Sequence, residues 1–308
     1  MSETLVEDAT ARTALGLARP VEPGVGPDPV RGFGPRRVTR FLLLRPGLLA
    51  SVLTVVLVVL AAFRPGLFTS QDPLQGVPSQ NFQGPSGAHW FGTDELGRDL
   101  FSRVVHGAQL SLKATLIAVG VAFLIGGLLG LVAGFVGRWV EDVVMRFVDV
   151  LLSIPALFLS LALVTALGYG TVKVAVAVGI ASVAGFARVM RAEVLRVRQA
   201  VFVEASRSCG ARWYSVLGRH VLPNAMGPVI VLATLEFGTA VLAVSSLSFL
   251  GYGAPPPAPE WGTLISDGRN YLGNAWWLTA LPGLVIAATV LATNRIARAL
   301  DGEWSRQR

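Results

Sequence analysis

The sequence predicts an all-α integral membrane protein with about six transmembrane helices, and three observations support this fold class. Of the 308 residues, 53% are hydrophobic and only 15% are charged, whereas a typical soluble domain has roughly 25% charged residues. Several apolar runs are long enough to cross a bilayer, and Lys and Arg gather in alternate connections between them. A chain this apolar cannot cover its surface with polar groups, so much of that surface must face lipid.

The six expected spans follow a polar N-terminal segment. Residues 1–40 are rich in Pro, Gly and Arg without apolar periodicity, which predicts a disordered cytoplasmic tail. It is no secretory signal, because the first apolar run starts only near Phe41. The spans are expected at about 42–63, 114–136, 148–171, 174–187, 225–250 and 275–294. The fourth has only 14 uncharged residues before Arg188, so we expect its helix to continue beyond the membrane as a charged extension.

The domain organisation follows from these spans. A first transmembrane helix at 41–63 precedes an extracytoplasmic segment at 64–110. The transmembrane core then covers 111–300, with a cytoplasmic loop at 200–223, and a cytoplasmic tail closes the chain at 301–308. With both termini in the cytoplasm, 20 of the 26 Lys and Arg residues lie inside. This asymmetry predicts a multi-pass protein of the cytoplasmic membrane with both ends inside, and it explains the basic residues better than a nucleic-acid partner does.

The second span carries a stripe of small residues at i, i+4 spacing, which predicts close packing against another helix. Its members are Ala114, Ala118, Ala122, Gly126, Gly130 and Gly134. Metal and disulfide chemistry are not indicated, because the chain has one cysteine, Cys209, and its three histidines lack metal-ligand spacing.

The most informative stretch is the basic cytoplasmic loop between the fourth and fifth spans. It begins Glu204-Ala205-Ser206-Arg207-Ser208-Cys209-Gly210 and ends His220-Val221-Leu222-Pro223-Asn224. Gly210 can supply a bend between two short helices, and Pro223 fits the first turn of the next helix, where a missing N–H costs nothing. The loop therefore predicts a rigid amphipathic projection suited to a groove in a soluble partner.

This loop resembles the hallmark of the permease subunits of ABC importers, E-A-A-x-x-x-G followed by a hydrophobic-x-L-P ending. The matching residues are Glu204, Ala205, Gly210, Leu222 and Pro223, with Ser206 in place of the usual Ala. The ending that starts at His220 is similar to that of the peptide-importing subgroup. The resemblance implies that this coupling loop docks on the ATPase subunit.

Two further stretches resemble the C-type subunit of dipeptide, oligopeptide and nickel importers. The first contains Phe91-Gly92-Thr93-Asp94, Gly97-Arg98-Asp99, Ser102-Arg103, Gly107 and Ser111-Leu112, and it has Gln109 where the family usually has Arg. The second contains Leu247-Ser248-Phe249-Leu250-Gly251, Pro256-Pro257, Trp261-Gly262 and Gly268-Arg269. The resemblance covers roughly residues 40–300.

The resemblance implies an ABC importer type I permease fold that moves di- or oligopeptides by alternating access. The implied partners are a second permease subunit in a heterodimer, two ATPase domains and an extracytoplasmic solute-binding protein, within the lipid bilayer. This chain would bind no cofactor itself, because ATP and Mg would lie on the partner subunits. The alternatives are a permease for nickel or another small solute, and a membrane scaffold or sensor without transport.

The chain is not expected to be an enzyme. A phosphate-binding P-loop needs Gly-Lys-Ser/Thr after a glycine-rich turn, and neither Lys113 nor Lys173 has that context. No Ser/His/Asp or paired-carboxylate arrangement stands out in the spans, which also disfavours an intramembrane protease. ATP hydrolysis would therefore reside on a separate subunit.

Two acidic residues lie in or near the spans. Asp149 follows Arg146 by three residues, so we expect an i, i+3 ion pair at the membrane boundary. Glu236 lies midway along the fifth span, where a charge usually faces a water-filled path or a partner. The alternative is a protonated or hydrogen-bonded structural Glu. Relatives often carry an acid at the position of Val244, which lies about 80° around the helix from Glu236, so Glu236 is no simple substitute.

Overall fold

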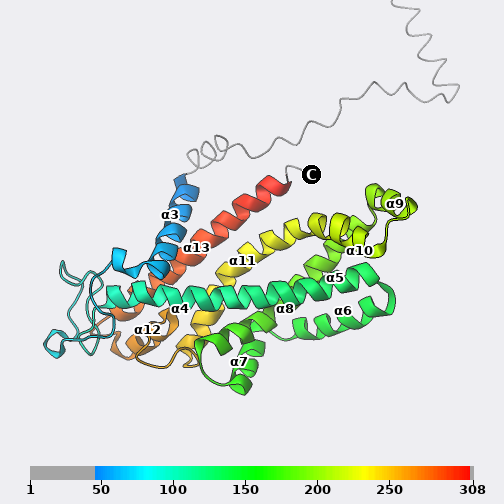
Figure 1. The fold of residues 1–308 in the computed structure, drawn as a ribbon. Coiled ribbons are helices and arrows are strands. Elements are labelled where there is room, and N and C mark those ends of the chain that lie inside the picture. The colour runs from blue at the N-terminus through cyan, green and yellow to red at the C-terminus, as the bar shows by residue number, and fades with distance from the viewer. Residues whose placement is uncertain (1–45, 306–308) are drawn as a thin grey trace, which may run out of the picture. The chain divides into compact units, whose positions relative to one another are not determined.

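The computed structural model describes the backbone of residues 46–305 and the side chains of residues 46–299, and this part of the chain is helical, without a named β-strand (Figure 1). The long helices are α3 (Pro46–Phe63), α4 (Leu100–Val121), α5 (Gly127–Val136), α6 (Arg138–Ser153), α7 (Ala156–Leu167), α8 (Thr171–Arg198), α11 (Leu222–Phe249) and α13 (Trp277–Ser305). Shorter helices are α9 (Val201–Ser208), α10 (Trp213–Val216) and α12 (Trp261–Gly268). The predicted tail at 1–40 and the start of the first predicted span lie outside the described residues.

Two π-helical turns join helices into longer continuous rods. Ala122–Gly126 connects α4 to α5, and Leu217–Val221 connects α10 to α11. Five helices of the described part are long and apolar enough to cross a membrane, namely Pro46–Phe63, Leu100–Val136, Thr171–Arg198, Trp213–Phe249 and Trp277–Ala299. The predicted all-α membrane fold is thereby confirmed.

The third predicted span, at 148–171, is wrong as a straight helix. The chain forms α6 and α7 instead, and these two helices are bent by 95° and pass as one span only when taken together. The cause lies at Pro155, which has no N–H and pushes the preceding residue out of the helical conformation. Ile154 accordingly adopts an extended conformation, with φ −97° and ψ 127°.

Two further helix boundaries depart from the sequence-based expectation, and one expected helix extension is present. The second helix begins at Leu100 rather than at 114, because the Asp99 side chain caps it by accepting a hydrogen bond from the Ser102 amide at 2.7 Å. The segment predicted as extracytoplasmic at 64–110 therefore ends in helix. The charged extension of the fourth span is confirmed, since α8 continues to Arg198. Finally, α13 continues to Ser305, into the predicted C-terminal tail at 301–308.

The small-residue stripe packs against α8 as predicted. All six of its members are buried. A Cβ added at Gly126 or Gly130 would overlap a backbone carbonyl oxygen of α8, that of Val183 or Ala187 respectively. The backbones of α5 and α8 can therefore approach closely only because these positions lack side chains.

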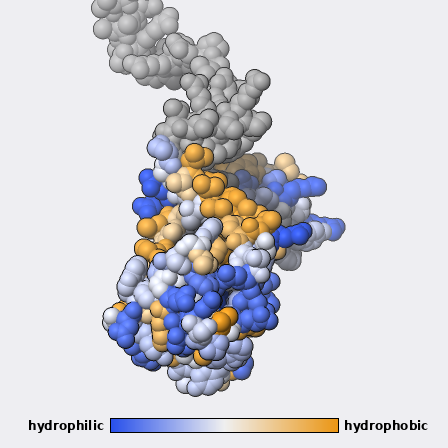
Figure 2. Space-filling view, turned by 90° about the vertical axis from the view of Figure 1, so that its left-hand side faces the viewer, coloured by the Kyte–Doolittle hydropathy of each residue, from blue (hydrophilic) through white to orange (hydrophobic). Residues whose placement is uncertain are grey.

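A folded polar segment, residues 64–99, lies at the end of the bundle opposite α9 and α10 (Figure 1). It is built on buried Asp94, which accepts hydrogen bonds from Arg98 Nε at 2.6 Å and from Arg103 Nη1 at 2.5 Å. Trp277 of α13 donates a further hydrogen bond to the Thr93 carbonyl at 3.2 Å. Figure 2 looks onto this end and shows hydrophilic residues gathered over it, with a hydrophobic area toward α3. The motif at 91–112 thus ties the polar segment to the helices.

Candidate functional site

The predicted bend at Gly210 is a helix C-cap with a specific geometry. Gly210 has φ +82°, in the left-handed region that favours glycine. Its amide donates to the Arg207 carbonyl at 2.9 Å, and the Ala211 amide donates to the Ser206 carbonyl at 3.1 Å. This pair of hydrogen bonds defines a Schellman motif, which ends α9 and turns the chain toward α10.

Three valines anchor this helix pair to the bundle. Val203 of α9, Val216 of α10 and Val221 are fully buried, and they share one apolar cluster with Val194 of α8. Only two residues separate α8 from α9, and the Ala200 amide bonds back to the Val197 carbonyl at 3.0 Å. The helix pair is therefore a rigid projection of α8 at one end of the molecule (Figure 1).

Four of the seven predicted coupling residues are exposed, on α9, at its C-terminal end and in the first turn of α11. Glu204, Ala205, Gly210 and Pro223 are exposed, and Ser206, His220 and Leu222 are half-buried. The Phe202 and His220 rings lie 6.3 Å apart, so the first turn of α9 lies beside the His220 end of the motif.

Sequence reasoning missed the large apolar side chains on the same projection. Val201 is 82% exposed and Trp213 is 67% exposed, and Phe202 and Tyr214 are also exposed. The sequence did hold a signal for this surface, because large apolar residues occur there outside any predicted span and next to charged residues. Such a surface is typical of a protein–protein contact.

Pro223 does lie in the first turn of α11, but the helix does not begin there as a separate element. The π-turn Leu217–Val221 leads into α11 without a break, and the Leu222 amide donates to the Leu217 carbonyl. The Asn224 side chain donates to the His220 carbonyl at 2.7 Å. The loop is therefore joined rigidly to α11 as well as to α8.

Glu236 lies near the middle of α11 and contacts α8. Its Oε1 accepts a hydrogen bond from the Ser182 hydroxyl at 2.6 Å, and the side chain is half-buried. Thr239, one turn further along α11, is exposed. The carboxylate thus lies between α8 and α11, the two helices that carry the projection, close to an exposed face of α11.

The predicted pairing of Asp149 with Arg146 is wrong. Asp149 instead pairs with Arg188 of α8 at 2.7 Å, and both side chains are more than half exposed. A second pair, Glu141 with Arg191, also joins α6 to α8. These contacts fix α6 against α8 near the projection. The described residues hold no cluster of three or more His, Cys, Asp or Glu side chains suited to a metal ion.

Long apolar helices that carry an exposed helix pair at one end define a multi-pass membrane protein. Residues 126–306 match the family described as binding-protein-dependent transport system inner membrane component, and the chain belongs to this family.

Its relatives include the dipeptide transport system permease protein DppC of Alkalihalophilus pseudofirmus, which is 41% identical over 79% of this chain and 80% of its own length. The probable D,D-dipeptide transport system permease protein DdpC of Escherichia coli K12 is 40% identical over 80% of this chain and 82% of its length. The glutathione transport system permease protein GsiD of Escherichia coli O6:K15:H31 is 40% identical over 90% of this chain and 92% of its length.

Among solved structures, the MetNI methionine ABC transporter in an inward-facing conformation is similar, with a TM-score of 0.52 and 22% identity. The match covers 64% of this chain and 96% of that one. This likeness confirms the predicted fold of an ABC importer permease.

Proposed function

We propose that this permease imports di- or oligopeptides and that α9 and α10 bind a separate ATPase subunit. The observation that carries the proposal is the Schellman-capped helix pair, which presents Glu204 and the exposed apolar residues Val201 and Trp213 on a rigid base. The peptide cargo is supported by relatives named for dipeptides and glutathione that align over most of the chain.

The contacts suggest how motion of the ATPases would reach the membrane. The projection continues into both α8 and α11, and α8 is packed against α5 through the glycine stripe. Displacing the projection would therefore move α8 and α11 together with α5. Glu236 and Ser182 lie on the two helices that move, so the open face beside them would change its access from one side of the membrane to the other.

The remaining partners follow from this arrangement. A second permease subunit would complete the pathway, and an extracytoplasmic solute-binding protein would deliver cargo to the end that carries the polar segment 64–99. Both termini would be cytoplasmic. ATP and Mg would be bound by two ATPase domains, and this chain would bind neither.

The test is transport by the full complex in reconstituted vesicles. The chain would be co-expressed with a second permease, ATPase subunits and a solute-binding protein. Radiolabelled dipeptide uptake should require ATP and the binding protein, and unlabelled peptide should compete while Ni²⁺ should not. Uptake of Ni²⁺ without peptide competition would favour the small-solute alternative, and assembly without any transport would favour a scaffold.

A further inference from the structure

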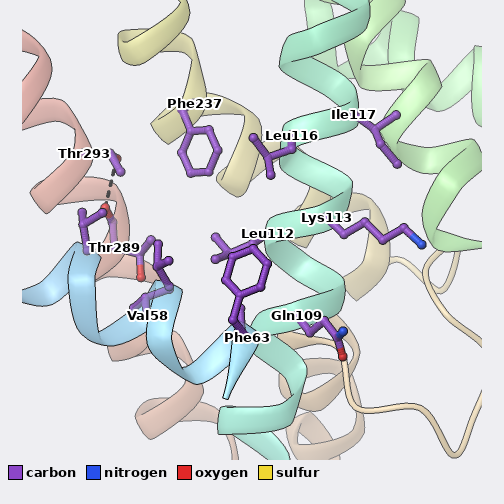
Figure 3. Close-up of a pocket in the computed structure, with 13 residues that line it drawn as sticks. Val58, Phe63, Gln109, Leu112, Lys113, Leu116, Ile117, Phe237, Thr289 and Thr293 are labelled. Atoms are coloured by element: carbon purple, nitrogen blue, oxygen red, sulfur yellow. Dashed lines mark hydrogen bonds between the residues drawn. The ribbon is translucent and has the colours of Figure 1, made fainter. Parts of the chain in front are cut away.

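An apolar hollow of about 520 Å³ lies between α3, α4, α11 and α13 (Figure 3). Nine of its thirteen lining residues are apolar, among them Val59, Phe63 and Leu116. Thr289 and Thr293 of α13 also line it, but their hydroxyls already donate to carbonyl groups of their own helix, at 2.7 and 2.9 Å. The depth of the hollow therefore offers an incoming molecule almost only hydrocarbon.

The two remaining polar side chains of the lining, Gln109 and Lys113, are one turn apart on the same side of α4, and both are exposed. Figure 3 shows the Lys113 chain running away from Phe63 and Thr289, so its ammonium lies at the rim of the hollow. Within residues 46–299, no acidic side chain forms an ion pair with the Lys113 ammonium and no hydrogen bond engages it. The hollow thus combines an apolar interior with one uncompensated positive charge at its rim.

The length of the helix is consistent with a place for this charge at a membrane boundary. The continuous helix α4–α5 ends at Val136, and the 23 residues from Lys113 to that end extend about 35 Å at about 1.5 Å per residue. The hydrocarbon core of a bilayer is about 30 Å thick. With Val136 at the opposite membrane surface, Lys113 would lie at the headgroup level of the leaflet on the side of segment 64–99. The end of α3 at Phe63, which lines the hollow, is followed by exposed Arg64.

We propose that this hollow binds an anionic phospholipid, with one acyl chain between α3 and α4 and the phosphate on Lys113. The interior matches hydrocarbon, the single ammonium matches the single charge of a phosphodiester, and the depth of the charge matches that of a headgroup. A bound lipid would fill the gap between α3 and the other helices and hold the first helix against the core. The inference does not depend on the cargo or on the ATPase contact.

The test is native mass spectrometry of the full complex, purified from bilayers that contain equal amounts of phosphatidylglycerol and phosphatidylcholine. The wild type should retain phosphatidylglycerol in preference. Lys113→Gln should reduce its retention about fivefold, the effect of one basic residue on attraction to an anionic lipid, and should abolish the preference. The matched control is Lys173→Gln, which removes the other lysine, exposed at the start of α8 and outside the hollow. It should leave retention unchanged.

A second variant tests the acyl chain separately. Val59→Trp would fill the hollow from a partly exposed position and should reduce retention of both lipids alike. If Lys113→Gln and Lys173→Gln lost phosphatidylglycerol equally, its retention would depend only on the net charge of the protein, and the proposal would be overturned. Full lipid retention in Val59→Trp would also overturn the proposal. So would a cross-link between a residue of the hollow and a helix of the second permease, found in place of bound lipid.

Discussion

The close contact between α5 and α8 depends on Gly130 having no side chain. A Cβ at this position would overlap the Ala187 carbonyl oxygen, and it would lie 2.8 Å from Met190 Cβ and 2.9 Å from the Arg191 amide nitrogen. Two of these three atoms belong to the α8 backbone, so the strain can be relieved only by moving the helix. Gly130→Ala should therefore separate α5 from α8 and destabilise the chain.

The expected magnitude follows from two opposing terms. Overpacking of a well-packed interior costs about 1–3 kcal/mol, and rigid backbone neighbours place Gly130→Ala at the upper end. Replacing glycine by alanine in a helix returns about 1 kcal/mol, so the net loss should be about 2 kcal/mol. Gly120 is the matched control, because it lies in the same continuous helix and a Cβ added there would meet nothing within 4 Å. Gly120→Ala should be neutral or gain up to about 1 kcal/mol.

The assay is the unfolding free energy of the purified full-length chain in mixed micelles, titrated with denaturing detergent. The two alanine variants should differ by about 2–3 kcal/mol, with Gly130→Ala the less stable. Equal midpoints for the two variants would refute the close backbone contact. Transport by Gly130→Ala should also fall after normalisation to assembled complex, because α5 would no longer follow α8.

Further predictions concern the projection, the topology and the membrane acid. Gly210→Asn should keep the left-handed turn and Gly210→Val should disrupt it, yet both should lose uptake because a side chain would block close docking; normal uptake with Asn would limit the role of Gly210 to the backbone. Asn81→Cys should react with an impermeant maleimide in whole cells, whereas native Cys209 should not. Labelling of Cys209 but not of Asn81→Cys would show that the topology is the opposite of the one predicted. Glu236→Gln should reduce peptide uptake while assembly and basal ATPase activity persist, and Ser182→Ala, which keeps the charge and removes the 2.6 Å hydrogen bond, should have little effect. If Glu236 is structural, Ser182→Ala should instead reduce peptide uptake more than Glu236→Gln does.

Much of the helical framework could be predicted from the sequence, because apolar runs and arginine placement report the bilayer directly. The break at Pro155 could not be predicted with the same ease. Pro228 and Pro282 lie inside α11 and α13 without ending those helices, so a proline in an apolar run does not by itself decide between a span and a bent pair. The early start of α4 was missed because buried Arg103 looks like a loop residue until its partner Asp94 is known.

The candidate site shows the same division between local and tertiary information. The bend at Gly210 is a local property, and the sequence predicted it correctly. The partner of Asp149 is Arg188, 39 residues away, which no helical spacing could indicate. The exposure of Trp213 likewise depends on how α10 packs through Val216, and only the fold reveals it.

The central claim, that α9 and α10 bind the ATPase, is tested most directly at Cys209. It is the chain's single cysteine, it is exposed, and it precedes Gly210 at the tip of the projection. The measurement is the rate of maleimide labelling of Cys209 in inside-out vesicles, with and without the ATPase subunits. The account predicts strong protection by the ATPase and cross-linking of Cys209 to an ATPase amine by a short linker with a maleimide and an active ester. Equal labelling rates, with no cross-link to the ATPase in a complex that transports, would contradict it.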